Sequence, residues 1–417
     1  MLKKPTDDKV DTLLSKSQIP IIDLAHCGTE EVPVRSVLTR VATQLHKALS
    51  EKGLAFLVNH GISEEKLKVA WKYLDDFCEL PTDVKEHYIR QKDDNHGYVQ
   101  PGQEKFDGKT PELRHCFNIC TLSAKHLPEE PLPGFADHVA GLAQDFKSLA
   151  GFLLQAVALG LDLQQQFFVE KHSHMLSGDH DNETTLRLLY YPPVIEDNNH
   201  LEFVKGRCKY SYQRCNMGDP DFRPEDPPSR RPSNMDPDAD LLDEIDSSLA
   251  EASLNPSERK CEANGCTAKP LAGFVRCGQH TDYGTFTLLA QDSEGGLEVK
   301  LPNGSKKWHR VGHLPGAILI NCGQILQIWT SERYPALLHR VVVPEQEHIR
   351  NKGRHSIAYF CHPDNLTMIS PDDLPHHEIE EDCTNKKPRK KSFRAAKEKV
   401  YNAYQLVQRR FKETYGA

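Results

Sequence analysis

The sequence predicts a mostly β protein with flanking helices, built on an antiparallel sandwich or barrel such as a jelly roll. In the last third of the chain, short apolar runs follow one another closely, and Gly, Pro and Asn residues separate them. Earlier segments are longer and carry apolar residues at helical spacing. For a chain of 417 residues, we expect one large domain with additions or two coupled lobes.

The N-terminal part has an α/β pattern. After a tail, residues 1–18, a short strand is predicted over residues 19–24. Apolar residues at helical spacing then predict a helix that ends at Gly53, and a buried strand follows over residues 54–58. We assign residues 19–125 to this N-terminal α/β region.

Residues 126–370 are assigned to the jelly-roll domain. A helix is predicted at its start, over residues 135–161, in addition to a second helix of the N-terminal region that ends near Pro81. A polar insertion, residues 195–272, interrupts the domain, and its centre is dense in proline and acidic residues. Such a segment cannot bury enough apolar surface to offset its ordering entropy, so we expect the insertion to be largely disordered.

Short strands are predicted after the insertion, where Gly, Pro and Asn punctuate the apolar runs. They are residues 285–289, 296–299, 308–311, 317–320, 339–343 and 356–360. The last part, residues 371–417, is predicted to be a linker and a C-terminal amphipathic helix, because apolar residues recur at helical spacing from Phe393 to Phe411.

Composition limits the partners and the compartment. The net charge of −8 argues against a nucleic-acid or anionic-membrane partner. Neither a secretory signal nor an apolar segment long enough to span a bilayer is visible. Twelve cysteines in such a chain indicate free thiols in a reducing compartment. We therefore expect a cytoplasmic protein that acts as a monomer.

The sequence His280-Thr-Asp282 is the first candidate for chemistry. Residues two apart on a strand point the same way, so one imidazole and one carboxylate would face a common point. His339 begins a later predicted strand and is the natural third ligand. Two histidines and one carboxylate form a facial triad, which leaves iron positions open for a co-substrate and dioxygen.

His-x-Asp alone is a weak signal. With 21 histidines, chance matches are expected, and His362-Pro-Asp364 is one. We discard that second match because proline inside the motif removes a backbone donor from a strand. The metal prediction therefore depends on what accompanies the first match.

Arg354-His-Ser356 lies on the last predicted strand. An arginine with a hydroxyl beside it suits a carboxylate, because a planar fork and one further donor converge. A buried arginine needs an anionic partner. That partner is either a ligand carboxylate, such as the free C5 carboxylate of 2-oxoglutarate, or a protein Asp or Glu.

Together these motifs resemble the isopenicillin N synthase-like 2-oxoglutarate/iron(II) dioxygenases. The C-terminal likeness comprises His280-Thr-Asp-Tyr-Gly-Thr-Phe-Thr-Leu-Leu289, Leu314-Pro-Gly-Ala-Ile-Leu-Ile-Asn-Cys-Gly323, His339-Arg-Val341 and Arg354-His-Ser-Ile-Ala-Tyr-Phe360. The N-terminal likeness comprises Ile19-Pro-Ile-Ile-Asp-Leu24, Asn59-His-Gly-Ile62, Leu80-Pro81 and Gly97-Tyr98. Ordered motifs over nearly the whole chain are more specific than any one of them.

The resemblance implies a double-stranded β-helix and an oxidoreductase. His280, Asp282 and His339 would bind Fe(II). Arg354 and Ser356 would hold the C5 carboxylate of 2-oxoglutarate, and Tyr191 would also contact this co-substrate. Dioxygen would oxidise a small organic substrate by hydroxylation or desaturation, with release of succinate and carbon dioxide, and ascorbate is a candidate reductant.

Departures from the family pattern bear on the substrate. Leu189 stands where plant members often have a co-substrate-binding Asn, and Gln324 stands where an Asp is usual.

Two alternatives to a 2-oxoglutarate-dependent enzyme stay open. Some relatives, such as aminocyclopropane-carboxylate oxidase, use the same triad and Arg-x-Ser without 2-oxoglutarate. The chain would instead be a non-catalytic jelly-roll binding protein if it lacked metal chemistry.

Three other residues near these motifs have competing interpretations. Arg187 is expected to form a structural ion pair. Phe360 and Tyr283 are expected to line the substrate pocket or to pack in the core. Four cysteines of the insertion, Cys208, Cys215, Cys261 and Cys266, have spacings that fit zinc poorly and favour free thiols.

Overall fold

The computed structural model describes most of the chain outside the insertion and the termini. The described residues are 19–27, 34–91, 94–104, 112, 114–123, 126–178, 181–197, 200–203, 212–213, 275–302, 307–343, 352–371, 374 and 401–415. The predicted N-terminal tail, the four insertion cysteines and most of the linker before the C-terminal helix lie outside these residues.

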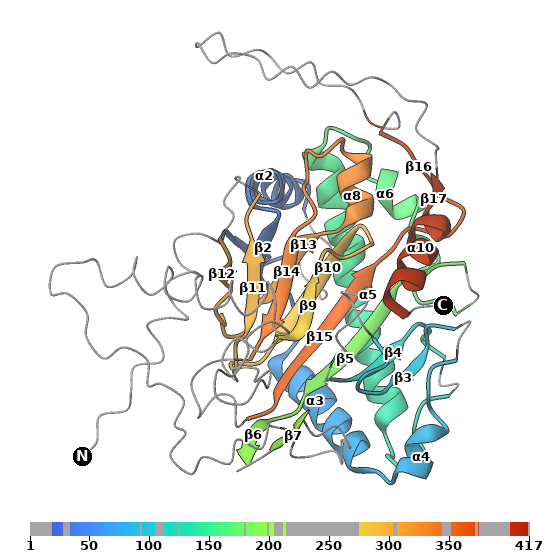
Figure 1. The fold of residues 1–417 in the computed structure, drawn as a ribbon. Coiled ribbons are helices and arrows are strands. Elements are labelled where there is room, and N and C mark those ends of the chain that lie inside the picture. The colour runs from blue at the N-terminus through green and yellow to red at the C-terminus, as the bar shows by residue number, and fades with distance from the viewer. Residues whose placement is uncertain are drawn as a thin grey trace, which may run out of the picture.

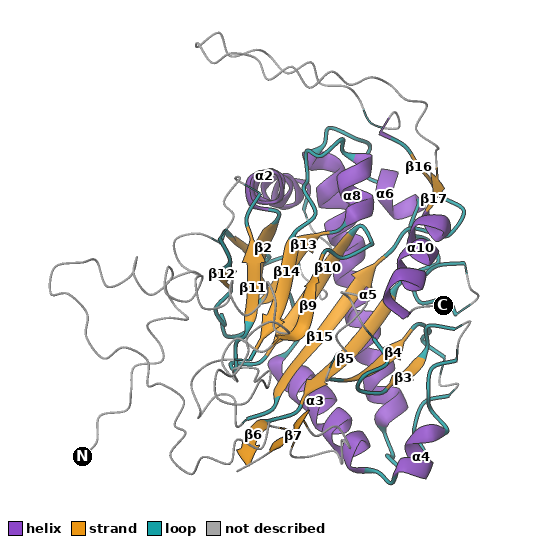
Figure 2. Ribbon diagram, in the orientation of Figure 1, coloured by secondary structure: helices purple, strands orange, loops and turns teal. Residues whose placement is uncertain are grey.

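Two β-sheets form the centre of the fold (Figures 1 and 2). The larger has the order β1-β2-β13-β10-β15-β5-β4-β3 and the smaller β12-β11-β14-β9. The larger comprises β1 (Ile21–Asp23), β2 (Leu54–Val58), β3 (Gly97–Val99), β4 (His115–Ile119), β5 (Thr185–Tyr191), β10 (Phe286–Gln291), β13 (Ile318–Cys322) and β15 (Arg354–Cys361). The smaller comprises β9 (Val275–His280), β11 (Leu297–Lys300), β12 (His309–Arg310) and β14 (Leu338–Val342).

Apart from the parallel pair β1–β2, neighbouring strands of both sheets run antiparallel. A shared cavity and a shared apolar cluster lie between the two sheets. This sheet-rich jelly-roll core with flanking helices confirms the predicted fold class.

Helices cover the other face of the larger sheet (Figure 2). They are chiefly α2 (Arg35–Lys52), α3 (Glu64–Glu79) and α5 (Phe135–Gly160). Ser63 caps α3 by accepting a hydrogen bond from the backbone N–H of Lys66, and two glutamates in the first turn complement the helix dipole. Gly53 ends α2 at a φ of 74°, a conformation that glycine adopts without strain. None of the described helices is long and apolar enough to cross a membrane.

The strands of the larger sheet alternate between the two cores. On β5, Leu186 and Leu188 pack with the helices, whereas Leu189 and Tyr191 face the smaller sheet. This period of two follows from the pleat of a strand. Burying each leucine contributes roughly 1.5–3 kcal/mol, which fixes the strand register and hence the direction of every polar side chain between them.

Shorter elements complete the described structure. They are α4 (Thr82–Glu86), α6 (Phe167–Glu170), α8 (Gln324–Trp329), α10 (Ala403–Tyr415), β6 (Val194–Asp197), β7 (His200–Phe203), β8 (Tyr212–Gln213), β16 (Met368–Ile369) and β17 (Tyr401–Asn402). Strands β6, β7 and β8 pair with one another inside the predicted insertion. These short strands lie in the first part of residues 195–272 and the remainder lies outside the described residues, so the largely disordered character of the insertion stays a prediction.

Other differences from the sequence expectations concern the N-terminal region and the tail. Strands β3 and β4 were not expected, and they extend the same sheet as β5 and β15. The N-terminal α/β region, residues 19–125, therefore contributes strands to the jelly roll. The C-terminal helix begins at Ala403 after the short strand β17, which pairs with β16.

Candidate functional site

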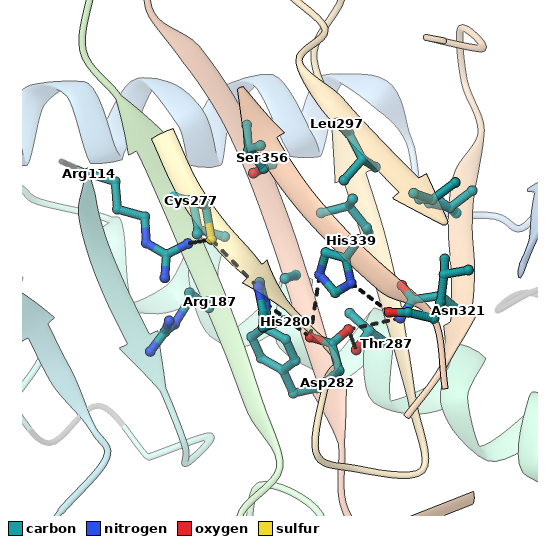
Figure 3. A pocket seen from close by; sticks show the side chains of 18 of the residues that line it. Arg114, Arg187, Cys277, His280, Asp282, Thr287, Leu297, Asn321, His339 and Ser356 are labelled. Atoms are coloured by element: carbon teal, nitrogen blue, oxygen red, sulfur yellow. Dashed lines mark hydrogen bonds and ion pairs between the residues drawn. The ribbon is translucent and has the colours of Figure 1, made fainter. Parts of the chain in front are cut away.

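Three predicted metal ligands meet between the two sheets (Figure 3). One ligand atom from each of His280, Asp282 and His339 lies within 4.8 Å of the others. Oδ1 of Asp282 is 3.7 Å from Nε2 of both histidines. The side chains are 15%, 6% and 14% exposed, so the three groups face an interior space with limited access to solvent.

Backbone carbonyls orient both imidazoles. Nδ1 of His280 is 2.8 Å from the carbonyl oxygen of Gly278, and Nδ1 of His339 is 3.0 Å from that of Leu337. Because a carbonyl only accepts, each Nδ1 carries a proton, and in the neutral imidazole this leaves the lone pair on Nε2. A histidine that binds a metal through Nε2 commonly has this second contact.

The carboxylate of Asp282 is held in a similar way. Its Oδ2 accepts hydrogen bonds from Oγ1 of Thr287 at 2.7 Å and from Nδ2 of Asn321 at 2.9 Å. Thr287 and Asn321 are directly opposite each other on β10 and β13, which explains how both reach one oxygen. Oδ1 remains directed at the two Nε2 atoms.

Burial and neighbouring charges set the protonation of these groups. Burial, followed by the neighbouring His339, lowers the pKa of His280, so its imidazole is neutral at neutral pH. Burial raises the pKa of Asp282, but His339, His280 and the two hydrogen bonds outweigh this, and its pKa lies below the usual value. A neutral imidazole at His280 and an ionised carboxylate at Asp282 suit a divalent cation.

The strand argument for His280 and Asp282 is wrong in its local detail. β9 ends at His280, and Asp282 lies in the loop that follows. The loop is held by α8, whose first backbone N–H groups donate to the carbonyl oxygens of Asp282 and Tyr283. Gly284 and Gly323 allow this contact, since a Cβ on Gly323 would lie 2.2 Å from the carbonyl oxygen of Gly284.

Arg354 lies on β15 and is only 1% exposed. Its Nη1 donates to Oγ of Ser356 at 3.2 Å, and its Nη2 donates to Oε1 of Gln291 at 3.1 Å. The buried Nε has no hydrogen-bond partner, and no carboxylate of the described residues pairs with this guanidinium. Leaving a buried cation without an anion is costly, so the position favours an anionic ligand.

Tyr191 lies beside Arg354. The two residues are cross-strand neighbours on β5 and β15, and the guanidinium carbon of Arg354 is 5.1 Å from the centre of the tyrosine ring. The tyrosine hydroxyl also accepts a hydrogen bond from Nη1 of Arg114 at 3.2 Å. All six predicted site residues line one cavity, with a free volume of about 630 Å³ that includes its opening to solvent.

Arg187 forms the expected ion pair. Its Nη2 is 3.0 Å from Oε1 of Glu104, and Glu104 also binds Arg114 at 2.8 Å. Arg187 lines the cavity as well, and so does Phe360. Tyr283 is not among the lining residues.

The discarded motif has a different role. Asp364 accepts hydrogen bonds from the backbone N–H groups of Ser173 and His174 and from Nδ2 of Asn182. These contacts connect the loop after β15 with the turn after α6 and with the segment before β5. Both oxygens of Asp364 are occupied by the fold, which agrees with its exclusion as a metal ligand.

Several residues of the cavity were not assigned a role from the sequence. Thr287, Gln291 and Asn321 orient the ligand groups, and Arg114 and Cys277 line the wall. Thr287 and Asn321 belong to the family motifs given above, where each is a polar residue between apolar neighbours. This pattern could have identified them as residues that face the site. For Arg114, no sequence pattern singled it out.

Two family models match the chain. The model of the 2OG-Fe(II) oxygenase superfamily matches residues 182–363, and the model described as "non-haem dioxygenase in morphine synthesis N-terminal" matches residues 19–136. Together they include every strand of the larger sheet and every residue of the cavity described above.

Curated relatives share most of their length with this chain. A 2-oxoglutarate-dependent dioxygenase, htyE, of Aspergillus rugulosus is 27% identical over 79% of this chain and 83% of its own. A 1-aminocyclopropane-1-carboxylate oxidase of Dictyostelium mucoroides is 24% identical, with 83% and 82% covered. The alignments with these relatives cover more of this chain than either family model does. The similarity therefore extends over both regions that the family models match.

Solved structures have the same fold. A full-length protein of Neurospora crassa, crystallised in complex with alpha-KG, superposes with a TM-score of 0.61 at 22% identity and covers 94% of this chain and 96% of that one. Family models, relatives and the convergence of two histidines and one aspartate agree. The chain belongs to the 2-oxoglutarate/iron(II) oxygenase superfamily, and its activity is that of a 2-oxoglutarate-dependent iron(II) dioxygenase.

Proposed function

We propose that His280, Asp282 and His339 bind iron(II) in this enzyme. The observation that carries the assignment is the convergence of three ligand atoms whose neighbouring atoms are already hydrogen-bonded. Both Nδ1 atoms and Oδ2 of Asp282 are occupied, so only the converging atoms are directed at a cation. A set of two imidazoles and one carboxylate is the donor set of non-haem iron oxygenases.

Arg354, Ser356 and Tyr191 are proposed to bind the C5 carboxylate of 2-oxoglutarate. The buried guanidinium offers a planar fork, and the serine and tyrosine hydroxyls offer further donors. This arrangement orients the co-substrate along β15, with its keto-acid end toward the metal ligands. Gln291 positions the guanidinium from β10.

The reaction proposed is hydroxylation or desaturation of a small organic substrate. Iron(II) and 2-oxoglutarate supply the redox chemistry, in which dioxygen is reduced and succinate and carbon dioxide are released. The chain orients both reactants, and its apolar wall excludes water from them. Leu189, Leu289 and Val299 are among the apolar residues that would contact the substrate.

The deciding test is anaerobic visible spectroscopy. The wild-type protein with iron(II) and 2-oxoglutarate should give the charge-transfer band of a chelated keto acid. His339→Ala should lose iron binding, the band and turnover, whereas Asp364→Asn should keep all three. Full iron binding in His339→Ala would contradict the ligand assignment.

The same measurement separates the two alternatives. Dioxygen consumption with a substrate, but no band and no stimulation by 2-oxoglutarate, would indicate an iron oxidase that does not use the keto acid. Binding of neither iron nor 2-oxoglutarate would indicate a non-catalytic jelly-roll protein. The complete donor set and the buried Arg354 favour the 2-oxoglutarate-dependent enzyme over both.

We also propose a cytoplasmic monomer whose partners are a small molecule and dioxygen, without nucleic acid or membrane. Seven cysteines among the described residues are free thiols, which suits a reducing compartment. The net charge of −8 opposes binding to polyanions. Light scattering of the purified protein would measure its mass, and a stable dimer would contradict the monomer.

A further inference from the structure

Two buried arginines line the cavity apart from the co-substrate residues. Arg114 precedes β4 and is 4% exposed, and Arg187 lies on β5 and is 7% exposed. Figure 3 shows both on the β4 and β5 side of the cavity, across His280 from Thr287. The proposed roles of iron and 2-oxoglutarate do not use either of them.

The strand register separates Arg187 from the co-substrate end of the cavity. Arg354 is paired with Tyr191, whereas Arg187 is paired with Ala358. Four residues along neighbouring strands correspond to roughly 13 Å. 2-Oxoglutarate has five carbons and would extend from Arg354 toward the metal ligands. It would therefore leave the side of the cavity beside Arg187 to a second ligand.

Contacts behind the wall orient both guanidinium groups. Glu104 accepts from Nη2 of Arg114 at 2.8 Å, and its two oxygens lie 3.0 and 3.3 Å from the Nη atoms of Arg187. Nε of Arg187 donates to Oδ1 of Asn118 at 2.7 Å, and Arg114 contacts the hydroxyl of Tyr191. Groups that are already oriented lose little freedom when they bind a ligand.

The charges that line the cavity favour an anion. Arg114, Arg187 and Arg354 are lining residues, and Asp282 is the one carboxylate among the described lining residues. Iron(II), Asp282, Arg354 and a 2-oxoglutarate dianion would together be neutral. The two remaining guanidiniums are lining residues, whereas Glu104, which contacts both, and Glu112, a buried carboxyl close to Arg114, are not.

We propose that Arg114 and Arg187 bind a carboxylate of the organic substrate, which is therefore a small organic acid. This inference rests on the proposed function, because it takes the metal and 2-oxoglutarate sites as given. Phe360 lines the same cavity, and the centre of its ring is 5.9 Å from the guanidinium carbon of Arg187. A substrate anchored on the arginines would place its carbon skeleton along this ring and toward the iron.

Matched acids and amides test the proposal without knowledge of the natural substrate. The probes are benzoate and benzamide, hexanoate and hexanamide, and phenylacetate and phenylacetamide. Each is added anaerobically to the protein with iron(II) and saturating 2-oxoglutarate, and its Kd is measured from the shift of thermal unfolding. Saturating 2-oxoglutarate keeps the acids away from Arg354.

In the wild type, at least one acid should bind about 10- to 100-fold more tightly than its amide, as a charge-assisted contact predicts. Arg187→Gln should remove most of this preference, and Arg187→Lys, which keeps the charge, should retain part of it. The stabilisation by 2-oxoglutarate itself should not change. If Arg187→Gln does not fold, Arg114→Gln tests the acid preference alone, because Arg114 also donates to the hydroxyl of Tyr191 in the proposed 2-oxoglutarate site.

Two results would overturn the proposal. One is equal binding of acids and amides by the wild type across the series. The other is an acid preference that persists in Arg187→Gln and Arg114→Gln, which would mean that the arginines only support Glu104. A failure of the proposed function looks different, because 2-oxoglutarate would then give no iron-dependent stabilisation before any acid is added.

Discussion

Arg354 and His355 are consecutive residues of β15, and both are cationic groups with little exposure, yet they face opposite sides of the sheet. His355 points toward α3, where its Nε2 is 2.8 Å from Oδ1 of Asp75. Its Nδ1 is 3.5 Å from Oδ2 of Asp292, which directly follows β10. Arg354 points into the cavity and pairs with no carboxylate of the described residues. The described part of the fold thus supplies carboxylate counter-ions to His355 and none to Arg354, which supports the proposed anionic ligand of Arg354.

The two aspartates of the His-x-Asp sequences differ in the same way. Asp364 uses both oxygens on neighbouring N–H and side-chain groups. Asp282 uses Oδ2 within the fold and directs Oδ1 at two imidazoles. Both aspartates have the same local sequence pattern, so the pattern does not separate a structural carboxylate from the proposed metal ligand. The two differ in whether the fold leaves one carboxylate oxygen without a hydrogen-bond donor.

The largest expected effect tests this pair. Asp282→Ala should abolish iron binding and turnover, because it removes the single carboxylate of the donor set. Asp364→Ala should keep iron binding and lower the free energy of unfolding by roughly 1–3 kcal/mol, since it leaves backbone N–H groups without acceptors. Iron content after anaerobic dialysis and chemical unfolding measure the two effects. Loss of iron from both variants would remove the distinction.

Arg354→Lys should raise the KM for 2-oxoglutarate about 10- to 100-fold and leave iron affinity nearly unchanged. Lysine keeps the charge but loses the planar fork that pairs with a carboxylate. His355→Gln is the matched control on the next residue, and its KM for 2-oxoglutarate should stay close to the wild-type value. Succinate release at varied 2-oxoglutarate measures both. A large change of KM in the control would show that the two faces of β15 are not independent.

His355 should make stability depend on pH. Burial lowers its pKa, but contacts with Asp292 and Asp75 outweigh this and raise the pKa from 6.5 to about 9. A group whose pKa is raised on folding stabilises the fold below its unfolded pKa. The contribution, about 2 kcal/mol after screening at the partly exposed Asp75, should therefore be complete below pH 6.5 and lost as pH rises through 9.

Urea unfolding at several pH values would measure this loss. His355→Gln should flatten the stability profile over that range. Arg354→Met, which removes the neighbouring cation, should keep the profile and hold or raise the stability of the ligand-free protein, because an unpaired buried charge is removed. A profile that is unchanged in His355→Gln would assign the pH dependence to another group.

Tyr191→Phe should have the smallest effect. It removes one neutral hydroxyl from the proposed co-substrate site, worth roughly 0.5–1.5 kcal/mol, and should raise the KM for 2-oxoglutarate about 2- to 10-fold. Iron affinity should not change. An effect as large as that of Arg354→Lys would mean that the hydroxyl acts through Arg114, with which it shares a hydrogen bond.

The fold class could be predicted from the sequence, because strand periodicity is a local signal. Motif order identified five residues of the candidate site, namely His280, Asp282, His339, Arg354 and Ser356. It did not predict the roles of Thr287 and Asn321. Those depend on the register between β10 and β13, which a single strand does not reveal. The loop geometry of Asp282 was also missed, since it depends on α8 and on the contact between two glycines.

The arginine wall, Arg114 and Arg187, illustrates the same limit at longer range. Arg187 was expected in an ion pair, and the structure supplies Glu104 as its partner. Their sequence separation gives no indication of contact, and Arg114 joins them from a segment with no recognisable pattern. Contacts between such distant charged residues form only when β4 pairs with β5 in the folded sheet.

The strand order of the larger sheet has a consequence for biosynthesis. β2 is made early, yet its antiparallel partner is β13, and β5 has β15 as one of its two neighbours. On the ribosome, these early strands must wait with unpaired edges until the distant partner strands have emerged. Pairing between such distant segments is slow, and exposed edges invite association with other chains. Synthesis of this enzyme should therefore depend on chaperones more than that of a chain whose neighbouring strands are consecutive.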